Sequence, residues 1–226
     1  MIHTPQPPAF HPVVLLLAAG SSHRMQGRNK LLTKVHKKRM IAKVICAYRL
    51  ALAHASIVVV TGYEHDLLHD EIQSMAINNV YTTYNPQYRQ GLYYSVHHGV
   101  LHLLNPKNHY DQATHVLISV SDIPLIQPET IQRIAKQSRI QPRSIHMPCM
   151  GEKIGHPICF PLNTLNNLPA PIGFMDKGLK PLFTHGMYSV NRIPCNDPGI
   201  HLDIDTPDDL QTARMLKASM QLNQQK

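Results

Sequence analysis

The segment "VLLLAAGSSHRMQGRNKLL", residues 14–32, changes from an apolar run into a loop rich in groups that bind anions. Its polar part holds four potentially cationic side chains, His23, Arg24, Arg28 and Lys30. An arginine can place two N–H donors on phosphate oxygens, and a lysine places a point charge against them. Ala18, Ala19 and Gly20 have little or no side chain, so a base or a phosphate can approach their backbone closely. The segment therefore predicts an anion-binding loop.

The spacing of this loop separates it from two common phosphate loops. It does not match G-x-x-x-x-G-K-[ST], which argues against a Walker-type phosphate loop, and it does not contain G-x-G-x-x-G, the usual dinucleotide fingerprint. If residues 13–17 form the first strand of a parallel sheet, the loop lies at the carboxyl end of that strand. Ligands bind at that end of such sheets.

Charge is distributed unevenly along the chain. Nine Lys or Arg precede the first acidic residue, Glu64, whereas the segment from Asp197 to Asp209 holds five aspartates and no Lys or Arg. The basic run Lys34 to Arg39 is either a solvated helix face or part of a positive end that faces a polyanion. A cation could bridge such a polyanion to the acidic segment.

Short apolar runs alternate with amphipathic segments through the first 140 residues. We expect strands in residues 13–17, 56–62, 79–84 and 114–122, and helices in residues 40–53, 64–76, 91–104 and 127–138. This alternation predicts an α/β fold, a Rossmann-like three-layer, mostly parallel sheet with helices on both faces. Residues 144–149, 156–160 and 188–193 are strand-like, and residues 206–220 predict a last helix with Thr206 as its N-cap.

The 226 residues are expected to form one domain, with an extended lead-in over residues 1–12 and a frayed tail over residues 219–226. No apolar run approaches the roughly 18 residues that a membrane span needs, and the first residues do not resemble a signal peptide. Four cysteines without a CxxC pair favour reduced thiols and a cytoplasmic protein that binds no membrane.

Six motifs together resemble the molybdenum cofactor cytidylyltransferase family, which has a MobA-like NTP transferase domain of the nucleotide-diphospho-sugar transferase type. They are "LAAGSSHRMQGRNKLL", "QGLYYSVHHGV", "SDIPLIQPETI", "GHPICF", "MDKGLKPLF" and "LDIDTPDDL", in the family's order over about residues 13–216. Gln26, Ser121 and Met175 stand where the family usually has glycine.

The resemblance implies attack of a phosphorylated acceptor on the α-phosphate of a nucleoside triphosphate, with release of pyrophosphate. Such transfers depend on positioning and on charge neutralisation. The implied catalytic residues are Arg24, Lys30 and Asp122. Arg24 and Lys30 would hold the triphosphate, and Asp122 would bind Mg²⁺. Asp203 is the implied second metal ligand, and Asp205 is the reserve.

The same resemblance assigns the remaining site residues. The implied nucleotide-binding residues are Ala18, Ala19, Gly20, Ser22, Arg24, Lys30, Gly91 and Ser95. The implied acceptor-binding residues are Gly155, His156, Asp176 and Lys177. Ser95 and His156 could instead be packing residues, and the aspartates near position 206 could instead start a helix.

The Ala-Ala-Gly form of the first loop is similar to that of pyrimidine-using relatives, which implies CTP as the donor and the molybdenum–molybdopterin cofactor as the acceptor. Another enzymatic function keeps the chemistry with a sugar phosphate or methylerythritol phosphate as acceptor. A third is a non-catalytic accessory protein that carries nucleotide or cofactor to a molybdoenzyme, which it would contact transiently. Nucleic-acid binding is disfavoured, since the basic segment lacks interleaved aromatic residues.

Overall fold

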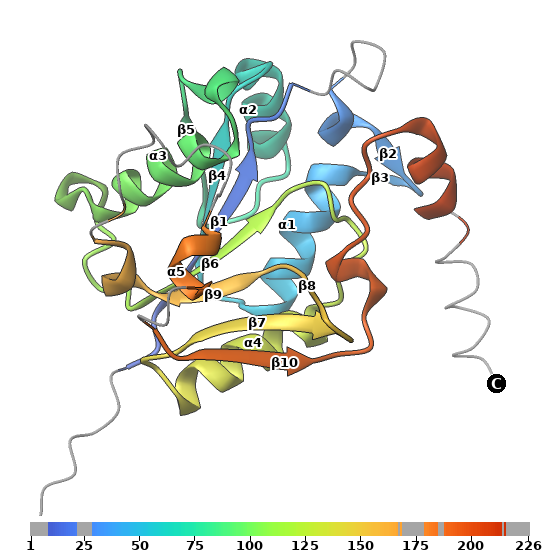
Figure 1. Ribbon diagram of the computed structural model, residues 1–226. Coiled ribbons are helices and arrows are strands. Elements are labelled where there is room, and N and C mark those ends of the chain that lie inside the picture. Colours follow the sequence, from blue (N-terminus) through green and yellow to red (C-terminus); the bar gives the residue numbers. More distant parts are fainter. Residues whose placement is uncertain are drawn as a thin grey trace, which may run out of the picture.

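An eight-stranded mixed sheet runs through the molecule (Figure 1). The computed structural model describes residues 9–21, 29–166, 168, 179–184, 188–213 and 215. The strand order is β10-β7-β9-β6-β1-β4-β5, with β8 paired to β7. The strands are β1 (Pro12–Ala18), β4 (Ser56–Thr61), β5 (Val80–Tyr84), β6 (His115–Val120), β7 (Ile145–Met150), β8 (Lys153–Ile154), β9 (Ile158–Pro161) and β10 (Val190–Pro194).

The part of the sheet that contains β1, β4, β5 and β6 is parallel. β1 pairs in parallel with β4 and β6, and β4 pairs in parallel with β5. β9 runs antiparallel to both β6 and β7, whereas β10 is parallel to β7. The carboxyl ends of β1, β4, β5 and β6 therefore meet at one edge of the sheet, where ligands bind in parallel α/β sheets.

Side chains of β1 alternate between two cores on opposite faces of the sheet. Val14, Leu16 and Ala18 pack with α1 (Met40–Ala51), α2 (His65–Ser74) and α4 (Pro128–Ile140). Val13, Leu15 and Leu17 pack with α3 (Leu92–Leu104) and border α5 (Lys180–Thr184). A strand buried on both faces reads as one continuous apolar run, as this one does. The predicted three-layer α/β fold is confirmed.

The last predicted helix begins where its cap residue indicated. Residues 207–213 are helical. The Thr206 hydroxyl accepts a hydrogen bond from the Asp209 backbone N–H at 3.2 Å, and Asp209 Oδ2 accepts one from the Thr206 N–H at 2.8 Å. This reciprocal pair is a capping box with aspartate in the glutamate position.

The basic run from Lys34 to Arg39 is a β-hairpin, so its interpretation as a helix face was wrong. β2 (Lys34–Val35) pairs antiparallel with β3 (Lys38–Arg39), and His36 in the turn has a φ of 59°. Val35 is fully buried between exposed neighbours, and this period-2 pattern favours extended structure over a helix. Arg39 pairs with Glu71 of α2 at 3.2 Å.

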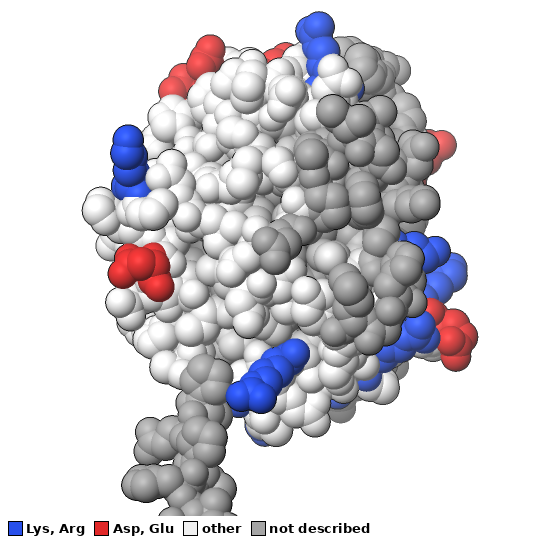
Figure 2. All heavy atoms as spheres, turned by 60° about the vertical axis from the view of Figure 1, so that its left-hand side comes forward, with Lys and Arg blue, Asp and Glu red and all other residues white. Residues whose placement is uncertain are grey.

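Charged side chains are sparse on the face that contains α3. Figure 2 shows this face, where most of the visible surface is uncharged and Lys, Arg, Asp and Glu stand mostly apart. Among the described residues, the basic excess is therefore not concentrated on this face.

None of the helices in the described ranges is long and apolar enough to cross a lipid bilayer.

Gly62, which follows β4, permits a close approach of two segments at the ligand-binding edge. A Cβ atom at this position would lie 2.4 Å from Tyr88 Cβ and 2.9 Å from Ala19 Cβ. Two further backbone contacts join the same segments, from Tyr63 N to Ala19 O at 3.4 Å and from Asn85 N to Thr61 O at 2.9 Å. The predicted nucleotide loop is thereby packed against the segment that leads into α3.

Replacing Gly62 by alanine should destabilise the protein, because atoms this close to a backbone Cβ cannot move aside cheaply. We expect Gly62→Ala to lower the free energy of unfolding by about 1–3 kcal/mol, measured by urea denaturation. Gly20→Ala is the matched control on the same loop, since nothing lies within 4 Å of its added Cβ. It should change stability by about 0.5 kcal/mol or less. Equal effects of the two substitutions would contradict the close approach.

Candidate active site

A cavity of about 600 Å³ opens at the carboxyl ends of β1, β4 and β6. This volume lies in the range of small-molecule sites. Seven of the residues that the sequence analysis assigned to the site line it: Ala18, Ala19, Gly20, Lys30, Gly91, Ser95 and Asp122. The structure therefore brings the opening loop, the segment of residues 90–100 and the aspartate after β6 to one place.

Lys30 is the central charged group of this cavity. Its Nζ atom lies 2.6 Å from Asp122 Oδ2 and 2.6 Å from Asp205 Oδ1. The three residues come from three distant parts of the chain, and the lysine side chain is only 11% exposed. Charge-assisted hydrogen bonds of this length are stronger than neutral ones, so the three segments are bound together at this point.

The turn that carries Lys30 is fixed by its two neighbours. Lys30 belongs to a short 3-10 helix, η2 (Lys30–Leu32). The side chain of Asn29 caps this turn by accepting a hydrogen bond from the Leu31 N–H at 3.1 Å. Leu31 is buried in the core beneath α1, and Asn29 is also buried. The lysine is therefore presented from a rigid base.

Backbone contacts place the two carboxylates. The Ser121 N–H donates to Leu17 O at 3.1 Å, and the Ile204 N–H donates to Asp122 O at 2.9 Å. The second contact carries the chain that contains Asp205 alongside the end of β6. Asp209 then accepts from the Asp205 N–H at 3.0 Å through its Oδ2 atom, which fixes this segment to the helix start.

The other aspartates of the acidic segment have different surroundings. Asp203 is exposed, and the salt bridges of Lys30 go to Asp122 and Asp205 instead. Asp197 is buried and caps a turn, because its oxygens accept from the N–H groups of Gln127 and Gly199. The structure thus pairs Asp122 with Asp205, the reserve metal ligand of the sequence analysis, rather than with Asp203.

The two carboxylates keep Lys30 charged. Burial lowers the pKa of its ammonium group, but the charges and hydrogen bonds of Asp122 and Asp205 more than offset that effect. The pKa of Lys30 is therefore raised above its ordinary value, and the group is a cation throughout the physiological range.

The same carboxylates fit a divalent cation. Asp122 Oδ1 is buried without a hydrogen-bond partner in the part of the chain that the structure describes, so a ligand there would satisfy it. Mg²⁺ is typically held by one or two carboxylates together with phosphate oxygens. Within that same part of the chain, no group of three or more His, Cys, Asp or Glu forms a complete metal cage. The donor set therefore suits a metal that arrives with a triphosphate.

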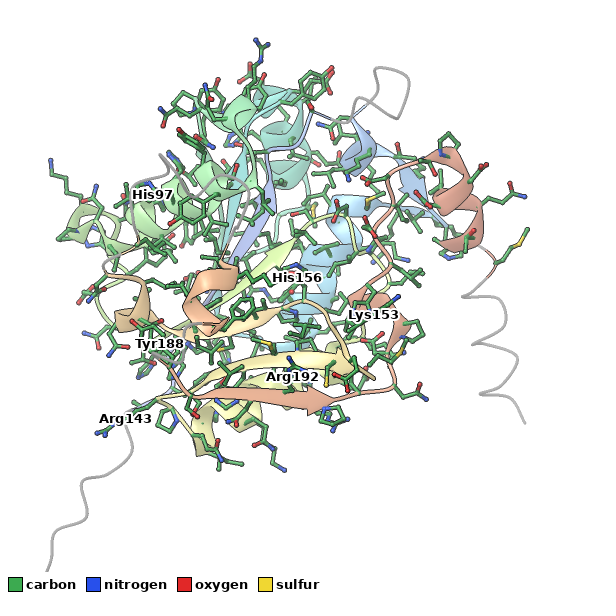
Figure 3. All side chains as sticks on the ribbon, viewed as in Figure 1. His97, Arg143, Lys153, His156, Tyr188 and Arg192 are labelled. Atoms are coloured by element: carbon green, nitrogen blue, oxygen red, sulfur yellow. The ribbon has the colours of Figure 1, made fainter. Side chains whose placement is uncertain are left out.

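Gly155 and His156 lie beside the acidic segment. The His156 N–H donates to Ile200 O at 3.3 Å, and a Cβ atom at Gly155 would lie 2.6 Å from Ile200 O, so only glycine allows this approach. Figure 3 shows His156 toward the middle of the molecule, whereas Arg143 and Tyr188 lie at the starting end of β7 and β10. Burial lowers the pKa of His156, and the Ile118 carbonyl and the Asp122 charge partly oppose this shift.

Several residues of the cavity were not found from the sequence. Tyr63, Tyr88 and Arg89 line it, and the Arg89 guanidinium lies 5.7 Å from the centroid of the Tyr88 ring. Tyr63 follows β4 by two residues, so its place at the carboxyl end of a predicted strand was the available signal. The predicted site residues Ser22, Arg24, Asp176 and Lys177 lie outside the described residues.

The sequence of residues 14–186 matches the family model for the MobA-like NTP transferase domain. The chain belongs to this family. It is therefore a nucleotidyltransferase, and the cavity is its candidate active site. Among proteins of curated function, none matches the chain in sequence.

Solved structures of related fold support the architecture of this nucleotidyltransferase. A Mycobacterium tuberculosis H37Rv protein in complex with manganese is 21% identical, with a TM-score of 0.67 over 92% of this chain and 99% of that one. Molybdopterin-guanine dinucleotide biosynthesis protein A from Archaeoglobus fulgidus is 16% identical, with a TM-score of 0.63 over 91% and 98%. The 4-diphosphocytidyl-2C-methyl-D-erythritol synthase of Anaerococcus prevotii is 12% identical, with a TM-score of 0.68 over 92% and 96%.

Removing the Lys30 charge should expose the affinity of the carboxylate pair for cations. We expect millimolar Mg²⁺ or Mn²⁺ to raise the melting temperature of Lys30→Met by several degrees more than that of the wild type. Saturation to about 100 times Kd stabilises by about 2.7 kcal/mol, and about 1 kcal/mol corresponds to roughly 2–4 °C for a chain of this size.

The double variant Lys30→Met/Asp122→Asn is the control for this thermal-shift measurement, because it lacks one carboxylate of the pair. Its melting temperature should respond to the metals no more than that of the wild type. A Lys30→Met protein with the same metal response as the wild type would show that the two carboxylates do not form a cation site.

Proposed function

We propose that the protein transfers CMP from CTP to a phosphorylated acceptor, the molybdenum–molybdopterin cofactor, with release of pyrophosphate. The observation that carries this proposal is the convergence of Lys30, Asp122 and Asp205 on a cavity at the carboxyl end of a parallel sheet. In the reaction an acceptor phosphate oxygen forms a bond to the α-phosphorus. The bond from that phosphorus to the bridging oxygen breaks, and pyrophosphate leaves with the electron pair.

Lys30 and Arg24 are proposed to hold the triphosphate. Lys30 is held with its charge already in place, and preorganised charge stabilises a transition state without reorganisation at the moment of reaction. Asp122 and Asp205 are the proposed Mg²⁺ ligands, with Asp203 as the alternative to Asp205. When bound, the metal would neutralise charge on the phosphates. The manganese-bound relative supports a divalent cation in this fold.

The nucleotide is proposed to lie between the opening loop and the start of α3. Ala18, Ala19 and Gly20 of the opening loop and Gly91 and Ser95 at the start of α3 all line the cavity. Gly91 has a φ of 112°, a conformation that favours glycine at the N-cap of α3. Tyr63 and Tyr88 supply aromatic surface on which a base can stack, since every base has a flat π-face.

CTP is proposed as the donor because the Ala-Ala-Gly form of the opening loop is similar to that of pyrimidine-using relatives. A pyrimidine is smaller than a purine and fits closer to this backbone.

The proposed acceptor-binding residues are Gly155, His156, Asp176 and Lys177. Methylerythritol phosphate is a second candidate acceptor, favoured by the fold shared with the diphosphocytidyl-methylerythritol synthase. We further infer that the chain forms one domain and that it contacts a molybdoenzyme transiently. A cytoplasmic location is also inferred, which is consistent with the four free cysteines.

Pyrophosphate release tests this function directly. With molybdenum–molybdopterin present, the wild type should release pyrophosphate from CTP in preference to UTP, GTP and ATP. Lys30→Ala should lower turnover at least 100-fold while the protein stays folded, because loss of one preorganised charge typically costs about 3 kcal/mol in the transition state. Ala19→Gly should relax the preference for CTP without abolishing transfer.

Three results of this assay would each contradict a different part of the proposed function. Unchanged turnover in a folded Lys30→Ala protein would remove the proposed role of the central lysine. Equal use of GTP and CTP by the wild type would overturn the nucleotide assignment and favour a guanylyl transfer. Release of pyrophosphate only with methylerythritol phosphate would replace the acceptor.

A further inference from the structure

Asn85 is a buried polar residue next to the nucleotide cavity that does not line it. It follows β5 directly and is 1% exposed. Its backbone N–H donates to Thr61 O at 2.9 Å, and its backbone oxygen accepts from the Tyr88 N–H at 3.3 Å. The residue is thereby anchored between the end of β4 and the segment that leads into α3 (Figure 1).

The side chain of Asn85 has one defined orientation. Its Oδ1 atom accepts a hydrogen bond from the Gln87 backbone N–H at 3.0 Å. Because that atom must be the carbonyl oxygen, the other atom is the NH₂ group, and this group donates to Ser95 Oγ at 3.1 Å. An amide flip would place two donors against each other at Gln87.

The orientation of the Asn85 amide determines whether the Ser95 hydroxyl donates or accepts a hydrogen bond in the cavity. A hydroxyl group has one proton and accepts through its oxygen, and Asn85 already uses the Ser95 oxygen as an acceptor. Ser95 is 3% exposed and lines the cavity, and its proton has no acceptor within the described ranges. A buried donor without a partner is costly, so an acceptor atom of a bound ligand is favoured there.

We propose that Asn85 is a positioning residue that makes Ser95 a hydrogen-bond donor toward N3 of the pyrimidine base and so selects a base that accepts a hydrogen bond at that position. The inference rests on the proposed function, which places the nucleotide in this cavity. Cytosine and uracil both accept at O2, but they differ at position 3, where cytosine has a lone pair and uracil carries a proton. A donor from Ser95 directed at N3 therefore favours cytosine over uracil, and sites that leave buried polar groups unpaired discriminate strongly.

Asn85→Asp converts the Asn85 NH₂ group into an acceptor with little change in shape. At pH 8.5, which favours the ionised form, a carboxylate at this position only accepts hydrogen bonds and would draw the Ser95 proton away from the cavity. The readout is the ratio of CTP to UTP affinity, measured by calorimetry with Mg²⁺ and without acceptor. We expect a ratio of at least 10 for the wild type and close to one for Asn85→Asp.

Asn85→Ala and Ser95→Ala complete the design. Asn85→Ala leaves the Ser95 proton free to rotate, so the affinity ratio should fall only partly, although alanine removes more buried contacts than aspartate does. In a Ser95→Ala background neither change at position 85 should alter the ratio further. A residue with a merely structural role would show the reverse order, with alanine more damaging than aspartate.

Several outcomes would overturn this inference. A folded Asn85→Asp protein that keeps the wild-type ratio at pH 8.5 would do so, as would position-85 effects that persist without Ser95. If Asn85→Asp does not fold, the cycle of Asn85→Ala and Ser95→Ala still decides, because additive effects on the ratio contradict the coupling. A wild type that binds no nucleoside triphosphate would overturn the proposed function itself, which distinguishes the two failures.

Discussion

The structure depends on one ammonium group held between two carboxylates. Lys30 reaches Asp122 and Asp205 at 2.6 Å each, and this contact joins the loop after β1, the end of β6 and the segment before the last helix. Removing one partner of such a buried cluster leaves charge uncompensated, which is far costlier than losing a surface ion pair. The same three groups are those proposed to hold the triphosphate and its metal, so one contact would serve both the fold and the reaction.

The polar groups of the cavity are held by neighbouring residues that do not line it. Asn29 caps the turn that carries Lys30, Asp209 accepts from the Asp205 N–H, and Asn85 fixes the hydroxyl of Ser95. Gly62 also fixes the cavity, because its missing side chain lets Ala19 and Tyr88 pack closely against its backbone. A nucleotidyltransferase needs this rigidity because positioning supplies most of its catalysis.

The sequence predicted the layers and most strands and helices, because buried parallel strands give continuous apolar runs and Thr206 is a strong N-cap. It predicted a helix or a polyanion site at Lys34 to Arg39, where a two-residue periodicity around Val35 was too short to recognise as a hairpin. It ranked Asp203 above Asp205, since spacing alone cannot say which carboxylate reaches a lysine 175 positions away. Asn85 carried no signal in the sequence, because its proposed role depends entirely on its contact with Ser95.

The most direct test of the central lysine–carboxylate cluster is the gain in CTP affinity that Mg²⁺ produces, measured by calorimetry with and without the metal. Asp122→Asn and Asp205→Asn should each reduce this gain at least tenfold, and Asp203→Asn, the matched change two residues away, should leave it within about threefold. These factors correspond to about 1.4 kcal/mol or more and to about 0.7 kcal/mol or less. A loss confined to Asp203→Asn, or equal gains in all four proteins, would contradict the account.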